Sequence, residues 1–211
     1  MRLGRATAKA TRYACKVFHY ARCVPSAQYS YSVFNDAGEW CGVIVFGGGA
    51  TPQIGKPFGL AQGEVLELVR VALNGKQGHG HTSQAVGMAL KQLHRDDPLV
   101  RLVVSYADCD QDHMGTIYQA TNWLYLGRCN EGERGAFIIN GHKVHRRSAG
   151  AMGVRQSIED VRARLDPNAE VFVTRGKRKY VYPFDKRLRK RLLPQAQPYE
   201  KREGQQALRM R

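Results

Sequence analysis

The sequence lacks long apolar runs, closely paired cysteines and any acidic residue in its first 35 positions. No stretch approaches the roughly 18 to 20 consecutive apolar residues of a membrane span, which excludes a helical membrane protein. The basic N-terminus also has no uninterrupted apolar run of the kind found in a secretion signal. We therefore expect a soluble cytoplasmic protein without a membrane partner.

The five cysteines are scattered, and none forms a Cys-x-x-Cys pair: Cys15, Cys23, Cys41, Cys109 and Cys129. An odd, dispersed set predicts free thiols in a reducing compartment and argues against a disulfide framework or a zinc ribbon.

Histidines give no firm metal signature either. His79 and His81 could bind a metal together with His19 or His113, but two histidines at this spacing more often face solvent or bond to backbone. We predict no metal; iron has a place among the candidates, but no ligand spacing supports it.

Positive charge is concentrated at the two ends of the 211-residue chain, whose formal net charge is +15. Residues 1–35 carry six cations and no acid, residues 175–211 carry thirteen cations and three acids, and residues 36–174 are close to neutral. Clustered Lys and Arg attract nucleic acid by releasing its condensed counterions. The aromatic residues among the C-terminal cations, Tyr180, Tyr182, Phe184 and Tyr199, could stack on bases. The alternative is a solvated tail, or one that docks on an anionic membrane surface.

Sequence patterns predict an α/β core. β-branched and aromatic residues at 29–34 and 40–46 flank turn-forming residues, which indicates a hairpin. Other patterns predict, in chain order, strands at 65–73, 99–106, 123–126 and 137–144, helices at 81–94, 114–121 and 154–165, and a basic hairpin at 170–182. Strands that alternate with helices imply at least one parallel pair.

A glycine-rich turn joins the strand at 65–73 to the helix that follows it. Gly75, Gly78 and Gly80 would allow close approach of a phosphate to the unpaired amides at the helix start. Such a turn is also often only a tight connection, and its spacing matches neither a Walker loop nor a dinucleotide fingerprint.

A second candidate site lies at the end of the next strand. Asp108 ends the segment Ser-Tyr-Ala-Asp at residues 105–108, and His113, Tyr118 and Asn122 follow. Ligand sites of open α/β sheets gather outside the carboxyl ends of strands, so we predict a cleft there. The alternative is that Asp108 caps a turn and Tyr118 packs beneath the sheet.

Several segments together resemble the Mom proteins of Mu-like phages. The most specific are residues 105–108 and the stretch Gly-Thr-Ile-Tyr-Gln-Ala-Thr-Asn-Trp at 115–123. Shorter matches are His-Tyr-Ala-Arg at 19–22, Val-Pro-Ser at 24–26, Glu-Leu-Val-Arg at 67–70 and His-Thr-Ser-Gln at 81–84. The resemblance runs from about residue 13 to residue 185.

This resemblance implies a GNAT-like fold, in which a mixed α/β sheet is flanked by helices. It also implies conversion of adenine in DNA to N6-carbamoylmethyladenine, which protects phage DNA from restriction, in the cytoplasm of the host bacterium. Together with the charge pattern it suggests a single domain: a basic N-terminal arm (1–12), a catalytic domain (13–185) and a basic C-terminal tail (186–211).

The family's functional positions fall on His19, Arg70, Ser83, Asp108 and Tyr118. Asp108 would accept a proton from the adenine amine or orient it, and Tyr118 would protonate the leaving group or hold the oxyanion. Arg70 and the amides of the glycine turn would hold phosphate, His19 would shuttle a proton or contact the base, and Ser83 would position the donor.

The product constrains the donor. An acetyl group lacks the nitrogen of a carbamoylmethyl group, whereas a glycyl group has the same atoms, so we expect an activated glycine such as glycyl-tRNA. Acyl-CoA is the alternative. In the CoA-binding turn of ordinary GNAT enzymes an Arg or Gln stands three residues before the middle glycine, and here Gly75 occupies that place.

The expected partners are double-stranded DNA, with the target adenine flipped out of the stack, and charged tRNA. Five residues are the candidate contacts to nucleic acid: Arg22, Lys177, Arg178, Lys179 and Tyr180. A homodimer is left open. Two other functions compete, namely a nucleic-acid-binding protein without catalysis and an acetyltransferase that acts on other amines.

Overall fold

The computed structural model describes residues 1–200, and the chain divides into two compact units. Among the described residues, the first comprises 1–107, 115–127 and 179–200; the second comprises 108–114 and 128–178. Residues 128–178, which the sequence analysis placed within one catalytic domain, thus cluster separately. Residues 201–211 of the expected basic tail lie outside the described residues. Within residues 1–200, no helix is both long and apolar enough to cross a membrane.

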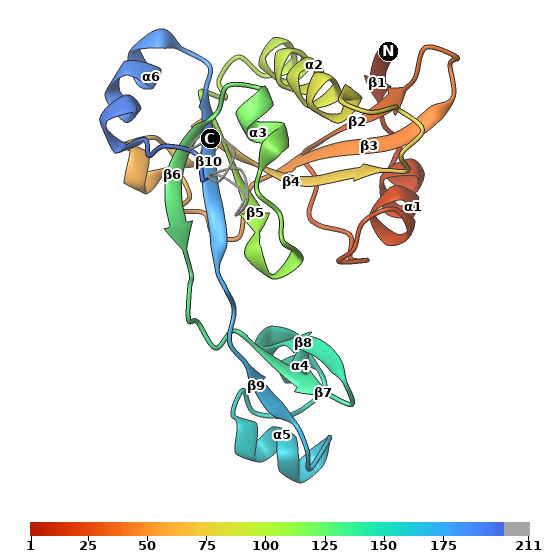
Figure 1. Ribbon diagram of the computed structural model, residues 1–211, viewed down its shortest axis with the longest axis vertical. Coiled ribbons are helices and arrows are strands. Elements are labelled where there is room, and N and C mark those ends of the chain that lie inside the picture. The colour runs from red at the N-terminus through yellow and green to blue at the C-terminus, as the bar shows by residue number, and fades with distance from the viewer. Residues whose placement is uncertain (201–211) are drawn as a thin grey trace, which may run out of the picture. The chain divides into compact units, whose positions relative to one another are not determined.

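A seven-stranded mixed sheet organises the first unit, in the order β1-β2-β3-β4-β5-β10-β6 (Figure 1). Strands β1 to β4 are successively antiparallel, and β4 pairs with β5 in parallel. The strands are β1 (Arg2–Arg5), β2 (Tyr29–Phe34), β3 (Trp40–Gly47), β4 (Val65–Leu73), β5 (Leu102–Asp108), β6 (Leu124–Cys129) and β10 (Lys177–Pro183). The parallel pair and the mixed α/β sheet confirm the predicted fold class.

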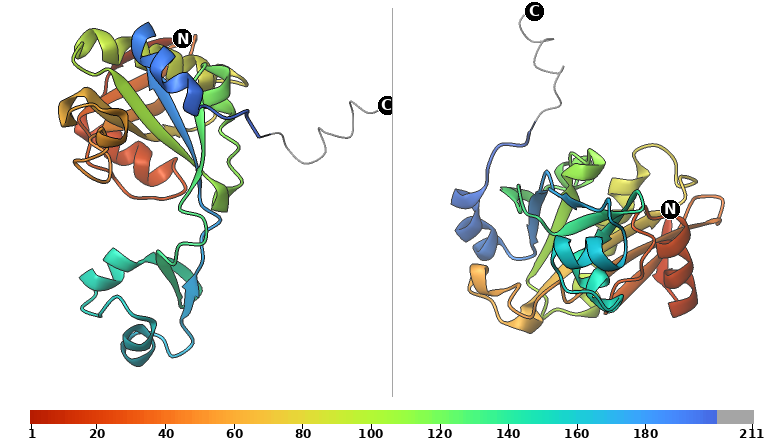
Figure 2. Two further views of the ribbon diagram at one scale, coloured as in Figure 1. Left: turned by 90° about the vertical axis from the view of Figure 1, so that its left-hand side faces the viewer. Right: turned by 90° about the horizontal axis from the view of Figure 1, so that it is seen from below.

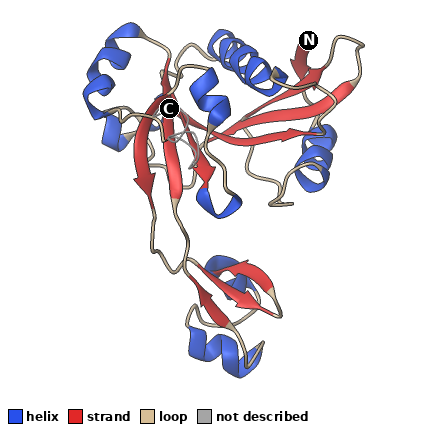
Figure 3. Cartoon of the chain, viewed as in Figure 1, coloured by secondary structure: helices blue, strands red, loops and turns tan. Residues whose placement is uncertain are grey.

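Two helices cover opposite faces of β3, because successive side chains of a strand point to opposite sides. Ile44 and Phe46 pack with the apolar face of α2 (His81–Asp96). Val43 and Val45 pack instead with Ala14 and Cys15 of α1 (Ala8–Val17). Figures 1 and 3 show helices on both sides of the sheet. The first unit also contains α3 (Thr116–Ala120), α6 (Lys186–Leu192) and the short 3-10 turns Lys56–Phe58, Gln62–Glu64 and Leu193–Gln195.

The expected N-terminal arm begins as part of the sheet. β1 pairs with β2 from Arg2↔Phe34 to Arg5↔Tyr31. Thr7 then caps α1 by accepting a hydrogen bond from the Ala10 amide at 3.1 Å. The expected boundary after residue 12 therefore falls inside a helix.

The second unit has a three-stranded antiparallel sheet in the order β8-β7-β9. Figure 2 gives two further views of these elements. They are β7 (Ala136–Ile139), β8 (His142–His145), α4 (Arg146–Ala151), α5 (Ile158–Arg164) and β9 (Glu170–Phe172), with the 3-10 turn Cys109–Gln111.

Two predictions for this region are wrong. The predicted strand at 137–144 is a hairpin, because Asn140 and Gly141 both have positive φ and form the two-residue turn between β7 and β8. The predicted basic hairpin at 170–182 does not form: β9 pairs with β7, whereas β10 lies between β5 and β6 in the larger sheet. The predicted hairpin at 29–46, the strand at 65–73 and the helix that begins at residue 81 are confirmed.

Candidate active site

The parallel strands β4 and β5 separate partway along their length. Their ladder runs from Val65↔Leu102 to Glu67↔Val104. Beyond it the Leu68 carbonyl accepts a hydrogen bond from the Ser105 side chain at 2.8 Å. The Ser105 hydroxyl lies 2.8 Å from the phenol oxygen of Tyr118. A side-chain pair thus continues the link between the two strands where backbone pairing ends.

Tyr118 occupies this point as a neutral phenol. It is 7% exposed, and its ring lies against those of Trp123 and Tyr180, with centroids 5.0 and 4.8 Å away. Burial raises the pKa of Tyr118 to about 12, although the hydrogen bond with Ser105 acts in the opposite direction. A protonated phenol can donate a hydrogen bond or a proton to a developing anion.

Glu67 is a candidate that the sequence analysis did not assign. It is half-buried in β4, and its charge is one of the causes that raise the Tyr118 pKa. The sequence around Glu67 offered only the Glu-Leu-Val-Arg match. The proximity of Glu67 to Tyr118 could not be predicted, because it depends on how α3 packs on the sheet. The sequence indicated Ser105 only as part of the Ser-Tyr-Ala-Asp motif, without a role of its own.

A bulge in the pairing of β3 and β4 determines the side of the sheet to which Arg70 points. The register shifts between Val45↔Arg70 and Phe46↔Leu68, so Val69 has no partner of its own. Leu66 and Leu68 face the α2 side, whereas the Arg70 guanidinium reaches the α1 side and donates to the Cys23 sulfur at 3.0 Å.

Arg70 has no anionic partner among residues 1–200. Its other hydrogen bond goes to the Val69 carbonyl at 2.6 Å, and its buried Nε has no acceptor there. A half-buried cation that has no carboxylate partner destabilises the fold unless a bound anion compensates its charge. Arg70 is therefore suited to bind an anionic group.

The three glycines of the turn all adopt a left-handed backbone conformation. Gly75, Gly78 and Gly80 have φ of 88°, 87° and 77°, a left-handed conformation that favours glycine. Gly80 caps α2 without a side-chain hydrogen bond, and the His81 amide donates to the Gly78 carbonyl at 3.4 Å. The amides that follow in the first turn have no side-chain cap from Gly80. Ser83 lies in that turn, but its hydroxyl donates to the Gly80 carbonyl at 2.8 Å and thus braces the turn.

Asp108 is the last residue of β5 and belongs to the second unit. Its carboxylate accepts a hydrogen bond from the Asp110 amide at 3.0 Å, and its carbonyl accepts one from the His113 amide at 3.1 Å. The turn cap, which was the alternative interpretation of Asp108, is thus present. The structure brings together Ser105 and Tyr118, but it describes Asp108 in a separate compact unit.

His19 and Arg22 lie just after α1. The His19 Nδ1 accepts a hydrogen bond from the Ala21 amide at 3.1 Å, and its ring lies 4.4 Å from that of Tyr20. Arg22 is exposed and has a positive φ of 48°. Arg22 directly precedes Cys23, whose sulfur accepts a hydrogen bond from Arg70.

Two of the predicted contacts to nucleic acid are buried, which corrects that assignment. Tyr180 is 0% exposed and packs against Tyr118 and Tyr125, so its ring offers no face to a base. Arg178 is 7% exposed and donates to the His113 carbonyl at 2.9 Å. Lys177 is exposed, and the Lys179 ammonium lies 4.8 Å from the centre of the Phe58 ring.

The other C-terminal aromatic residues also pack within the first unit. Tyr182 contacts Trp123, and Phe184 stacks on His94 at 4.6 Å and 11°. The Tyr199 hydroxyl donates to the Trp123 carbonyl. Alternation of aromatic and basic residues in this region therefore reflects a strand and helix with one buried face, and not a stacking platform.

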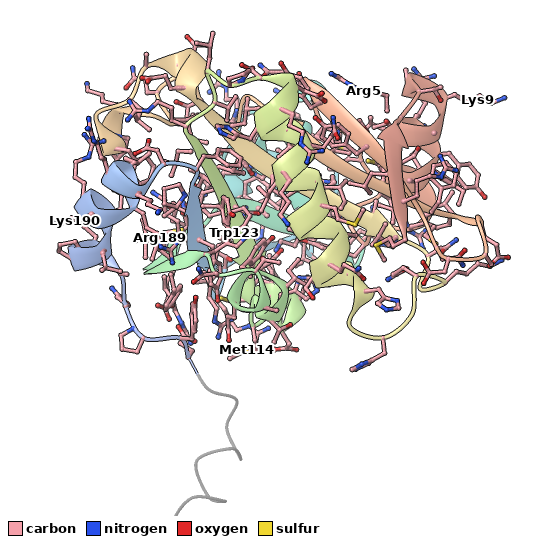
Figure 4. The ribbon with its side chains drawn as sticks, turned by 90° about the horizontal axis from the view of Figure 1, so that it is seen from above. Arg5, Lys9, Met114, Trp123, Arg189 and Lys190 are labelled. Atoms are coloured by element: carbon pink, nitrogen blue, oxygen red, sulfur yellow. The ribbon has the colours of Figure 1, made fainter. Side chains whose placement is uncertain are left out.

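Two groups of cations lie at opposite ends of the first unit. Figure 4 shows Arg5 and Lys9 at one end and Arg189 and Lys190 at the other. α6 buries Leu188 and Leu192 and exposes Lys186, Arg187 and Lys190. Among the described residues, no three His, Cys, Asp or Glu side chains gather as a metal site.

Two sequence comparisons with known proteins give matches over most of the chain. Residues 1–201 match the model of the Mom protein family. The chain is 27% identical over 188 residues to the protein named methylcarbamoylase mom of Escherichia phage Mu, a match that covers 87% of this chain and 76% of the relative.

Solved structures show the same fold at low identity. A variant of spermidine N-acetyltransferase from Vibrio cholerae is similar with a TM-score of 0.50 and 10% identity, over 87% of this chain and 95% of that one. A chimera of that enzyme gives a TM-score of 0.51 and 10% identity, over 87% and 96%. These likenesses confirm the GNAT-like fold that the sequence predicted.

Proposed function

Because this chain belongs to the Mom protein family, we propose that it is a transferase that converts adenine in DNA to N6-carbamoylmethyladenine. The product protects phage DNA from host restriction. The family match over residues 1–201 is the observation that carries this proposal, and the name of the phage Mu relative supports it.

The reaction needs a proton donor that stays protonated at neutral pH. Tyr118 meets this need because burial raises its pKa to about 12. Ser105 has one proton, which it gives either to the Leu68 carbonyl or to the phenol oxygen. In the second arrangement the phenol proton is free to stabilise an oxyanion or to reach a leaving group.

Phosphates of the substrates would bind at two separate places, Arg70 on the α1 side of the sheet and the glycine turn at the start of α2. Arg70 contacts no carboxylate within residues 1–200, and the turn presents uncapped amides at the start of a 16-residue helix. Both groups favour negative charge. His19 and Ser83 would position the two substrates.

We propose an activated glycine, such as glycyl-tRNA, as the donor, with acyl-CoA as the alternative. Attack of the adenine amine on the glycyl carbonyl forms a C–N bond and breaks the ester C–O bond, and the leaving hydroxyl takes a proton. The glycyl amine then attacks C6 of the ring, the original C6–N bond breaks, and that nitrogen becomes the carboxamide. Asp108 would accept or orient the proton of the adenine amine.

Two polyanionic substrates would account for two separate basic regions. One lies around β1 and α1 and the other on α6, at opposite ends of the first unit (Figure 4). Double-stranded DNA would supply the flipped adenine and charged tRNA the glycine.

Mass analysis of nucleosides from cells that express the chain tests this function. Carbamoylmethylated adenine is expected, and replacement of Asp108 by Asn should abolish most of it. Asp112→Asn is the matched control, because Asp112 is an exposed acid of the same loop. Unmodified DNA would instead favour the binding protein or the acetyltransferase of other amines. Labelled glycine should place two carbons and one nitrogen in the base; a label that enters only from acetate would contradict the glycyl donor.

A further inference from the structure

A cavity that is open to solvent lies on the α1 side of the sheet, within the basic region around β1 and α1. Its volume is about 520 Å³, within the usual range for small-ligand sites. Side chains of β1, α1, β2 and β3 line it, among them Arg5, Lys9, Tyr13, Phe34 and Trp40. Three aromatic rings and two cations thus surround one space.

The aromatic rings are held in place by their neighbours. Trp40 donates its indole N–H to the Ser32 hydroxyl at 3.3 Å, and its ring centre lies 6.0 Å from that of Tyr13. Phe18 contacts both rings, at 5.7 and 5.6 Å. Tyr13 is nevertheless 52% exposed. Rigid, accessible rings are the surfaces on which unstacked bases bind.

A row of cations continues from the cavity along α1. Lys9, Arg12 and Lys16 are exposed and follow one another at helical spacing, so the row extends over about 10 Å. α1 contains no acid. A mononucleotide would occupy only one end of this row, whereas a strand could place successive phosphates along it.

We propose that this cavity binds one unstacked nucleobase of a nucleic-acid strand whose phosphates follow the cations of α1. Tyr13, Trp40 and Phe34 would contact the base, and Lys9, Arg12 and Lys16 would contact the phosphates. The inference rests on the proposed function only in taking nucleic acid as the partner. The test measures binding and not catalysis. It therefore remains valid even if the chain does not modify DNA.

Tryptophan fluorescence reports on the cavity directly. The chain has two tryptophans, and Trp123 is fully buried in the core, so quenching by a base reports on Trp40. A ten-residue oligothymidylate should quench the fluorescence saturably. Trp40→Phe should remove the quenching, because only Trp123 then emits. A duplex of the same length should quench less, since its bases are stacked.

Single substitutions distinguish the contribution of the base contacts to binding from that of the phosphate contacts. Tyr13→Ala should weaken binding at least about fivefold. Lys9→Gln should weaken it and reduce its dependence on salt, whereas Lys91→Gln, an exposed lysine of α2, should do neither. Circular dichroism confirms that each variant is folded. Equal quenching by an abasic oligonucleotide or by the duplex, or unchanged affinity of both Tyr13→Ala and Lys9→Gln, would overturn the proposal.

Discussion

The phenol oxygen of Tyr118 lies 2.8 Å from the hydroxyl oxygen of Ser105, which lies 2.8 Å from the carbonyl oxygen of Leu68. All three groups are at the point where β4 and β5 separate. Ser105 has one proton, so it either donates to the Leu68 carbonyl and accepts from the phenol, or donates to the phenol oxygen and leaves the phenol proton free.

Removal of the Ser105 hydroxyl and removal of the Tyr118 hydroxyl should have different effects. Ser105→Ala leaves the buried Leu68 carbonyl without its donor and should lower the free energy of unfolding by about 1–3 kcal/mol. Tyr118→Phe keeps the ring packing, so it should lose most DNA modification with a smaller loss of stability. Urea unfolding and nucleoside analysis measure the two effects. Tyr125→Phe, another buried tyrosine of the same cluster, is the control and should retain activity.

Tyr118 should also make stability depend on alkaline pH. Its pKa is raised to about 12 in the folded chain from an ordinary 10, so folding favours the protonated phenol. The contribution is complete below pH 10 and is lost as pH rises toward 12. Unfolding of wild type and Tyr118→Phe at pH 8, 10 and 11 should show a steeper decline for wild type. Parallel declines would indicate that the phenol ionises as readily in the folded chain.

Asp110 should control the stability of the second unit. Its carboxylate accepts hydrogen bonds from the Lys143 ammonium, the Thr174 hydroxyl and the Arg175 amide, each at 2.8 Å. Burial raises the pKa of Asp110, but these bonds outweigh it and lower the pKa overall. The stabilisation is present above the ordinary pKa near 3.8 and is lost as pH falls through the lowered value.

Asp110→Asn should therefore destabilise the chain by about 1–3 kcal/mol at neutral pH. Limited proteolysis should then cut residues 128–178 faster than in wild type. Asp112→Asn is the control, because Asp112 is largely exposed and its ion pair with Arg175 contributes little. Equal cleavage of the two variants would assign no special role to Asp110.

The exposed cations of α6 should contribute to DNA affinity without sequence preference. Lys186, Arg187 and Lys190 face solvent, while Arg189 is used structurally and donates to Asn122 at 2.9 and 3.0 Å. Neutralising the three should reduce the slope of log affinity against log salt by about 0.9 for each lost phosphate contact. Filter binding at several salt concentrations measures this slope. A triple variant with an unchanged slope would remove α6 from the DNA surface.

Local patterns were sufficient for much of the fold. The strand Val65–Leu73, the hairpin around residues 35–39 and the helix that begins at His81 were predictable, because periodicity and turn residues act over a few positions. The Asn-Gly turn at residues 140–141 carried a clear hairpin signal that the prediction of a single strand overlooked.

The sequence by itself determined the mixed α/β class, the glycine turn and the family to which the chain belongs. Only the tertiary structure decided which polar and aromatic side chains are accessible. Tyr180 and Arg178 look like nucleic-acid contacts in a basic segment, yet both are buried. Tyr180 lies in β10, which is inserted between β5 and β6, and the Arg178 guanidinium donates to the Cys109 sulfur and the His113 carbonyl. Tyr13 and Trp40, 27 residues apart, share a cavity because α1 packs across β3. Burial and proximity arise from pairing between distant segments, which no local pattern encodes.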